Sequence, residues 1–389
     1  MRLFSCITLG VCFTAVWLAA QPPALVREGP WWVERTGGTI PAPGSPFLRI
    51  EAAGDVVFQG DGGSSFGYQV TRRVIARSED EARRLLAAVP VAPVWNGSQL
   101  TLSLPSRGGR MQADVRVQPP RQLRQVVVES EDGDVAVRDV RAPVNVFSTA
   151  GSVICDRIQG SVSVRTGGGE VILGAIQGAI LAKTGGGSVR LRQGLSTATL
   201  ETGGGEIVVE EVTGALAART GAGNIEVGQA GSTVHARTYG GLIRINHAAG
   251  EVVAESAGGG ILIGRAKSVR CESAAGAVKL AGMTGQVEVT TTVGSILADL
   301  LGTRPLLNSL LSAARGDITV WIPGGLAVTV NAVTDSPRSR IVSDFAEIPV
   351  RETWQGGEAR LTARGSLNGG GPVLRPATGE GVVYLRRRE

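Results

Sequence analysis

The stretch Val162–Lys183 reads VSVRTGGGEVILGAIQGAILAK, and its pattern recurs through the middle of the chain. A threonine or serine followed by a glycine-rich stretch returns every 18 residues from Thr166 to Ser256, with slips of one residue on either side of this run. A fixed period of this kind is typical of a solenoid, in which each unit buries its apolar face by stacking on its neighbours. We expect the hydroxyl residues to form one structural column, made of Ser130, Thr149, Thr166, Thr184, Thr202, Thr220, Thr238, Ser256, Ser273 and Thr291.

Two short runs of alternating residues flank each hydroxyl residue. Counted from Thr166 as position zero, positions −4 and −2 are Val162 and Val164, and positions +5 and +7 are Val171 and Leu173. Alternation with a period of two predicts strands that bury one face, and stacked coils align such residues into internal ladders. The sequence therefore predicts an all-β fold, a single-stranded β-helix or β-solenoid with about 18 residues per coil.

The residues that point outward differ from coil to coil. Position −1 is charged in successive repeats, and opposite charges often follow one another: Arg165, Lys183, Glu201, Arg219, Arg237, Glu255 and Glu272. Exposed cross-strand pairs contribute only roughly 0.2–1 kcal/mol each, so we interpret this column as a solvated face. We expect the glycines to allow positive φ where the chain reverses, and the hydroxyls to bond to neighbouring turns.

The composition changes toward both ends of the chain, which divides it into five predicted segments. Residues 1–20 read as a secretory signal peptide and residues 21–45 as a flexible leader. Residues 46–118 predict a small β-α-β cap, in which Ser78 and Glu81 form a capping box at the start of a helix. The coils follow at 119–300, and 301–389 predict further coils and a second cap, after a short helix or loop at 300–314.

The predicted signal peptide places the protein in the periplasm, at the cell surface or outside the cell. The formal net charge of +5, with acids and bases mixed along the chain, does not predict a nucleic-acid partner. No stretch beyond the signal segment is long and apolar enough for a membrane span. Cys155 and Cys271 lie about six coils apart, too far for a disulfide, so we expect buried free thiols.

No motif in the repeats predicts a cofactor or a metal. The glycine runs lack the aspartates of calcium-binding nonapeptides and the Lys-Ser or Lys-Thr of a phosphate-binding loop. His235 and His247 project from adjacent coils, but two imidazoles alone make no convincing metal site. The nearest acid cluster is Glu206, Glu210 and Glu226, which we interpret as solubilising charges. We therefore assign no catalytic, cofactor-binding or metal-binding residue and expect no enzyme activity.

Coils of the form V-x-V-x-T-x-G-G-x-V-x-L, followed by DITVWIPGGLAVTVNAV and GSLNGGGPVLRPATGEGVVYL, resemble the putative adhesin family of bacterial envelope proteins. The resemblance covers roughly residues 120–389 and implies β-helix repeats similar to the head domains of auto-transporter adhesins. It also implies right-handed coils. The family brings no catalytic residues to carry over.

Three functions remain open from the sequence. The first is an adhesin-like binding module of the bacterial envelope, which presents its outer face to a polysaccharide or to another envelope protein. The second is a structural or assembly protein whose coils stack on one another. The third is a polysaccharide lyase or glycosidase, which would need two facing carboxylates or an acid cluster that holds calcium.

Overall fold

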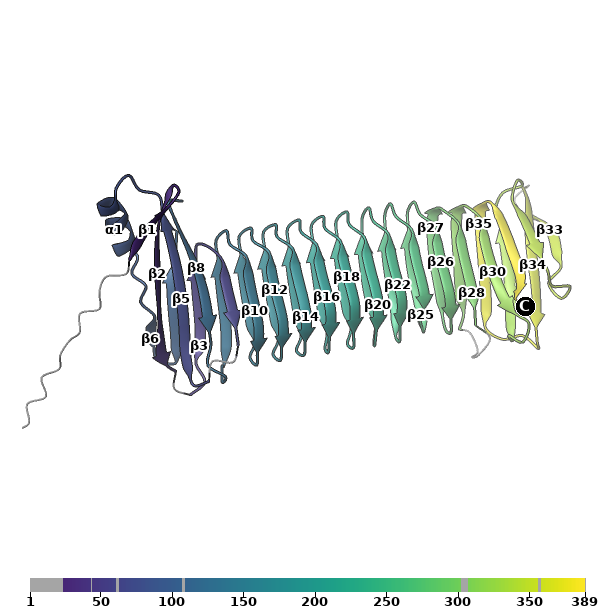
Figure 1. The fold of residues 1–389 in the computed structure, drawn as a ribbon. Coiled ribbons are helices and arrows are strands. Elements are labelled where there is room, and N and C mark those ends of the chain that lie inside the picture. Colours follow the sequence, from purple (N-terminus) through teal and green to yellow (C-terminus); the bar gives the residue numbers. More distant parts are fainter. Residues whose placement is uncertain are drawn as a thin grey trace, which may run out of the picture.

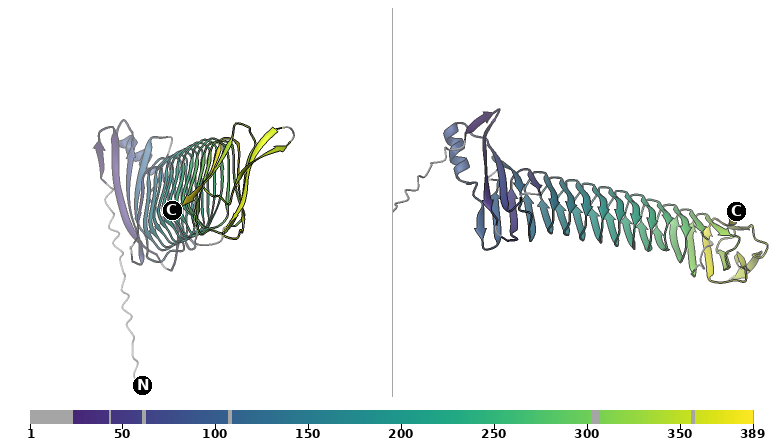
Figure 2. Two further views of the ribbon diagram at one scale, coloured as in Figure 1. Left: turned by 90° about the vertical axis from the view of Figure 1, so that its right-hand side faces the viewer. Right: turned by 60° about the horizontal axis from the view of Figure 1, so that its bottom comes forward.

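The computed structural model describes residues 24–42, 44–60, 63–106, 109–301, 307–355 and 358–388. The predicted signal peptide at residues 1–20 lies outside these residues. The chain forms a β-solenoid of about 11 turns with roughly 18 residues per turn, which confirms the predicted fold class. The turns stack into a straight rod (Figure 1), and they superimpose when the rod is viewed from its end (Figure 2). No helix among the described residues is long and apolar enough to cross a membrane.

Each coil contributes one strand to each of two parallel sheets, and every strand pairs with its counterpart in the next coil. Val162, for example, pairs with Ile180, and Ile180 with Ala198. The coil strands of sheet A are β10 (Val135–Val140), β12 (Val153–Ile158), β14 (Val171–Ile176), β16 (Val189–Gly194), β18 (Ile207–Val212), β20 (Ile225–Ala230), β22 (Ile243–Ala248), β24 (Ile261–Arg265), β26 (Val278–Met283), β28 (Ile296–Leu300) and β30 (Ile318–Pro323). Those of sheet B are β9 (Gln125–Ser130), β11 (Val144–Ser148), β13 (Val162–Thr166), β15 (Ile180–Thr184), β17 (Ala198–Thr202), β19 (Leu216–Thr220), β21 (Val234–Thr238), β23 (Glu251–Ser256), β25 (Ser268–Ser273), β27 (Val287–Val293) and β29 (Ser309–Arg315).

The core lies between the two sheets and runs the length of the rod. The predicted inward positions are buried in each coil, as Val162, Val164, Val171 and Leu173 show with exposures of at most 1%. Burying a side chain of this size stabilises the folded chain by about 1.5–3 kcal/mol. Since each coil adds the same ladder, the rod grows by repetition of one local packing solution.

The hydroxyl column holds together the turns that lead from sheet B to sheet A. Thr166 Oγ1 donates to the carbonyl oxygen of Gly151 in the preceding coil (2.8 Å) and accepts the N–H of Gly169 in its own turn (3.4 Å). The predicted member Thr149 is wrong: it is exposed, and Ser148 is the buried residue that pairs with both Ser130 and Thr166. The reason is strand alternation, since Val144, Val146 and Ser148 point inward together. The predicted one-residue slip at Ser273 is confirmed, because Ser273 pairs with Ser256, 17 residues earlier.

The turn glycines are required by close approach and not by positive φ. None of the three glycines after Thr166 has a φ in the left-handed region. A Cβ on Gly169 would lie 2.2 Å from the carbonyl oxygen of Gly151, and one on Gly167 would lie 2.1 Å from that of Thr149. The backbones of successive turns therefore stack too closely to admit a side chain at these two positions, whereas Gly168 faces open space.

The N-terminal end is more elaborate than predicted. Its elements are β1 (Leu25–Glu28), β2 (Trp31–Pro41), β3 (Phe47–Ala52), β4 (Val56–Gln59), β5 (Ser65–Val74), α1 (Glu79–Ala87), β6 (Val94–Asn96), β7 (Gln99–Leu104) and β8 (Met111–Gln118). The predicted flexible leader is wrong for residues 25–28 and 31–41. These residues form β1 and β2, and β2 pairs antiparallel with β5 over ten residues. The Gly and Pro residues of this stretch and the lack of regular alternation in β2 explain the error.

A coil from earlier in the sequence is inserted at this end. β3 pairs with both β7 and β9, and β4 pairs with both β8 and β10, so the β3–β4 coil lies between two later ones. The predicted helix is present as α1 and lies at the N-terminal end of the rod (Figure 1). Ser78 Oγ accepts the N–H of Glu81, whereas the Glu81 carboxylate accepts the N–H of Arg77 and so completes the cap one residue earlier than a capping box does.

At the C-terminal end, too, a coil is inserted between two coils that are distant from it in the sequence. Its elements are β31 (Val328–Thr334), β32 (Arg340–Ser343), β33 (Val350–Gln355), β34 (Glu358–Leu367), β35 (Val373–Glu380) and β36 (Val382–Arg388). The β35–β36 coil lies between β29–β30 and β31–β32, and β34 then pairs antiparallel with β31. The predicted short helix or loop at 300–314 is wrong for residues 309–314, because they alternate between the core and solvent within β29.

Candidate functional site

Two adjoining hollows follow the hydroxyl turns along one edge of the rod, and we call them together the turn groove. The first has a volume of about 660 Å³ and the second about 470 Å³. Arg237 and Tyr239 line both hollows and so join them. The first is otherwise lined by Lys183, Thr184, Glu201, Thr202, Gly203, Arg219, Thr220 and Gly221, and the second by Thr238, Glu255, Ser256, Ala257, Glu272, Ser273, Ala274, Thr290 and Thr292.

Tyr239 occupies a position where four successive coils before it have glycine. These glycines follow the hydroxyl residue directly, and at each a Cβ would lie 2.0 to 2.1 Å from a carbonyl oxygen of the preceding coil; they are Gly167, Gly185, Gly203 and Gly221. The backbone shifts locally to accept the tyrosine. Gly221 N donates to the Thr202 carbonyl, 19 residues earlier, whereas Tyr239 N donates to the Gly221 carbonyl, 18 residues earlier. A residue that breaks a local packing rule is a candidate for a functional role.

The ring of Tyr239 is open to solvent. The residue is 61% exposed, the second highest exposure among the large hydrophobic residues that the structure leaves at the surface. The Arg237 guanidinium carbon lies 5.5 Å from its ring centroid, and Arg237 Nε lies 3.4 Å from a carboxylate oxygen of Glu255. Arg237 thus orients the ring without covering it. An aromatic ring held in this way offers a platform for the apolar face of a ligand.

The charged column forms one wall of the groove. Lys183 Nζ lies 2.6 Å from Glu201 Oε2, so these two charges are paired. Arg219 follows Glu201 and precedes Arg237 in register, yet its guanidinium makes no ion pair or hydrogen bond with any described residue. The first hollow therefore has three cationic residues against one carboxylate, and one of those cations is free.

The candidate acids and histidines of the sequence are not brought together. Glu226 lies on β20 beside Arg244, Glu210 lies on β18, and Glu206 lies in the turn that precedes β18. None of the three lines the turn groove. His235 is on sheet B and His247 on sheet A, so they belong to different sheets. Among the described residues, no three His, Cys, Asp or Glu side chains gather where a metal could bind.

The two cysteines of the coils also lie apart. Cys155 is on β12 in sheet A and Cys271 on β25 in sheet B, and both are buried free thiols, as predicted. Burial raises the pKa of each thiol to about 12. A neutral, buried thiol is a packing residue and not a nucleophile.

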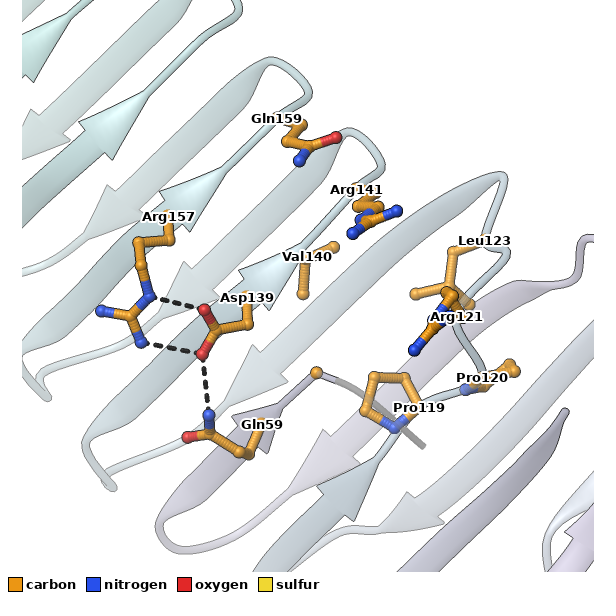
Figure 3. Close-up of a pocket in the computed structure, with 11 residues that line it drawn as sticks. Gln59, Pro119, Pro120, Arg121, Leu123, Asp139, Val140, Arg141, Arg157 and Gln159 are labelled. Atoms are coloured by element: carbon orange, nitrogen blue, oxygen red, sulfur yellow. Dashed lines mark hydrogen bonds and ion pairs between the residues drawn. The ribbon is translucent and has the colours of Figure 1, made fainter. Parts of the chain in front are cut away.

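A separate pocket of about 480 Å³ lies where the N-terminal unit meets the first coils (Figure 3). Arg157 holds the Asp139 carboxylate with two hydrogen bonds of 2.5 and 2.8 Å, and Gln59 donates to the same carboxylate at 2.8 Å. The Arg157 hydrogen bond keeps the pKa of Asp139 below its ordinary value. Asp139 and Arg157 are 18 residues apart and both have positive φ values, 59° and 53°. Asp139 and Arg157 neutralise each other, and the Gln59 hydrogen bond ties β4 to the coils. We therefore interpret this group of three residues as structural.

Comparison with known proteins gives a weak likeness only. No family model matches the chain, and no curated protein matches it. A crystal structure described as a putative adhesin from Bacteroides fragilis NCTC 9343 is 12% identical, covers 74% of this chain and 96% of its own, and gives a TM-score of 0.25. One described as a putative cell adhesion protein from Clostridium sporogenes ATCC 15579 is 7% identical, covers 92% of this chain and 100% of its own, and gives a TM-score of 0.21. Sequence identities and TM-scores this low carry no information about the function, which depends on the residues of the turn groove.

Proposed function

We propose that this protein is an exported, non-catalytic binding module of the bacterial envelope, adhesin-like in its role, which holds an extended polymer in the turn groove. The observation that carries the proposal is Tyr239, an exposed aromatic ring at a position where the four preceding coils have glycine. A side chain accommodated by a backbone shift and left in solvent adds nothing to the core. Its place between two hollows suits contact with a ligand.

The shape of the groove favours a linear polymer over a small molecule. The groove follows seven consecutive turns, from Thr184 to the turn that contains Thr292, so six steps of about 4.8 Å give a length of about 29 Å. Its floor is the backbone of a continuously hydrogen-bonded solenoid. A rigid floor loses little conformational entropy when a ligand binds, which favours affinity from modest contacts.

The carboxylates of the groove support binding and not hydrolysis. Glu201 is paired with Lys183, and Glu255 is paired with Arg237. Glu272 stacks directly beside Glu255 in the same column, so these two lie on one side of the groove. Glycoside hydrolysis needs two carboxyl groups that flank the scissile bond.

The test is polysaccharide binding by the intact protein and by Tyr239→Gly, which restores the residue of the preceding coils. We expect wild type to bind a subset of linear glycans on an array, and Tyr239→Gly to lose most of that binding while its unfolding midpoint stays the same or rises. Tyr239→Phe should retain binding because it keeps the ring.

The matched control is Thr149→Gly, which also introduces glycine at this turn position, but five coils away and without removing an aromatic ring. Binding by Tyr239→Gly at the level of Thr149→Gly would refute a role for the groove. Release of new sugar ends from a bound polymer would refute the non-catalytic assignment.

A further inference from the structure

We infer that the polymer of the turn groove carries carboxylate groups, and that Arg219 binds one of them beside a sugar ring stacked on Tyr239. The inference rests on the proposed function and adds the chemical class of the ligand. A uronate-type polysaccharide, with a carboxylate on a pyranose ring, has this chemistry.

Arg219 is the residue that points to an acidic ligand. Its neighbours in the charged column are already engaged, since Glu201 pairs with Lys183, and Arg237 with Glu255. Arg219 is exposed and has no partner among the described residues, although Glu201 lies one coil away in register. A guanidinium presents two parallel N–H donors that match the two oxygens of a carboxylate.

The floor of the first hollow lets a ligand approach this arginine closely. Gly203 and Gly221 follow Thr202 and Thr220, so no side chain rises between the charged column and the groove. Tyr239 belongs to the next coil, and its N–H is bonded to the Gly221 carbonyl at 3.2 Å. The backbone segments that carry the ring and the guanidinium are thus one coil apart along the rod, a step of about 4.8 Å. Because one sugar residue of a linear glycan has a similar length, a sugar on Tyr239 places its neighbour at Arg219.

The two hollows differ in the sign of their charge. The first contains Lys183, Arg219 and Arg237 against Glu201, a formal sum of +2. The second contains Arg237 against Glu255 and Glu272, a formal sum of −1. A carboxylate is therefore favoured at the first hollow and disfavoured at the second. Consequently, Glu272→Gln should strengthen the binding of a polymer that carries a charge on every sugar.

The experiment compares polygalacturonate with the same polymer after full methyl esterification, which removes the charges and keeps the backbone. With the full chain at low salt, we expect the ester to bind roughly tenfold more weakly than the acid. Arg219→Gln should reduce binding of the acid by a similar factor and leave binding of the ester unchanged. Arg165→Gln is the matched control, since it removes an exposed arginine of the same column outside both hollows and should change neither affinity.

Four results would overturn the inference. Equal binding of acid and ester would show that no carboxylate is recognised at Arg219, and equal effects of Arg219→Gln and Arg165→Gln would show the same. In either case the proposed binding function would stand if Tyr239→Gly still weakened binding. Dextran sulfate that binds as tightly as polygalacturonate, with no loss in Arg219→Gln, would show nonspecific attraction to a basic protein. A groove that binds no polymer in any form would remove the proposed function as well.

Discussion

The Thr202 hydroxyl donates a hydrogen bond to the carbonyl oxygen of Gly187, which lies 15 residues earlier in the preceding coil, at 2.8 Å. It also accepts the N–H of Gly205 in its own turn at 3.1 Å. One buried side-chain oxygen therefore satisfies two backbone groups that belong to different coils. The same pair of hydrogen bonds recurs at Thr166, Thr184, Thr220 and Thr238, so the column links each turn to the preceding one by hydrogen bonds.

Replacing Thr202 by valine should destabilise the solenoid by about 1–3 kcal/mol, because the Gly187 carbonyl and the Gly205 N–H both lose a partner while they remain shielded from water. Thr202→Ser keeps the hydroxyl and should cost much less. Urea unfolding of the two variants followed by circular dichroism measures the difference. Equal losses in valine and serine would show that the methyl group matters and the hydrogen bonds do not.

Two adjacent glycines should respond in opposite ways to alanine. A Cβ at Gly205 would lie 2.1 Å from the Gly187 carbonyl oxygen, so Gly205→Ala must push two turns apart and should cost about 1–3 kcal/mol or more. Gly204 has open space around it and no left-handed φ, so Gly204→Ala should be neutral or stabilise by about 0.4–1 kcal/mol. Thermal unfolding of both variants decides the matter, and similar midpoints would contradict the close-approach argument.

The helix at the N-terminal end depends on a buried ion pair. The Arg72 guanidinium binds the Glu34 carboxylate, with Nε at 3.0 Å, and also donates to the carbonyl oxygens of Leu86 and Val89. Both side chains are at least 90% buried. Arg72→Met should therefore destabilise the N-terminal end by about 3–5 kcal/mol, since Glu34 remains as an uncompensated charge.

The second replacement Glu34→Leu in the Arg72→Met background should recover part of this loss, because it removes the unpaired charge. Hydrogen exchange provides the readout: amides of α1 and β5 should lose protection, while those of β18 and β20 keep it. Loss of protection along the whole rod would mean that the N-terminal unit nucleates the entire solenoid.

The buried thiols make stability depend on alkaline pH. Cys155 and Cys271 have pKa values raised from 9.0 to about 12 by burial, so the folded chain holds two protons that the unfolded chain releases more easily. Their contribution is complete below pH 9 and declines as the pH rises from 9 toward 12. We expect Cys155→Ala/Cys271→Ala to show a shallower decline in unfolding free energy over this range than wild type. Peptide mapping after thiol labelling should find both residues unmodified until the chain unfolds.

Much of the fold could be predicted because its rules are local. The alternation around Thr166 specifies which side chains of one coil face inward, and the period of 18 repeats that instruction. The predicted hydroxyl column was wrong at one residue: Thr149 and Ser148 are both hydroxyl residues, and the alternation from Val144 selects Ser148, which pairs with Thr166. Tyr239 can be seen in the sequence as an aromatic residue that is nearly alone among the coils. Nothing in the sequence indicates that the Tyr239 N–H changes its partner, or that Arg219 in the preceding coil has no partner among the described residues, because both facts depend on how neighbouring coils stack.

The solenoid, the coil length and the inward ladders can be predicted from the amino-acid sequence, because alternation acts over a few residues and the 18-residue period repeats it. The order of the coils at the two ends, by contrast, depends on tertiary packing. There β3–β4 and β35–β36 are inserted between coils distant in sequence. Coils with the same inward ladder can stack on one another in any order. The order of the coils is therefore set by the packing of the elements at each end. The same holds for the groove, whose aromatic ring and free guanidinium come from different coils and meet only because the turns are stacked.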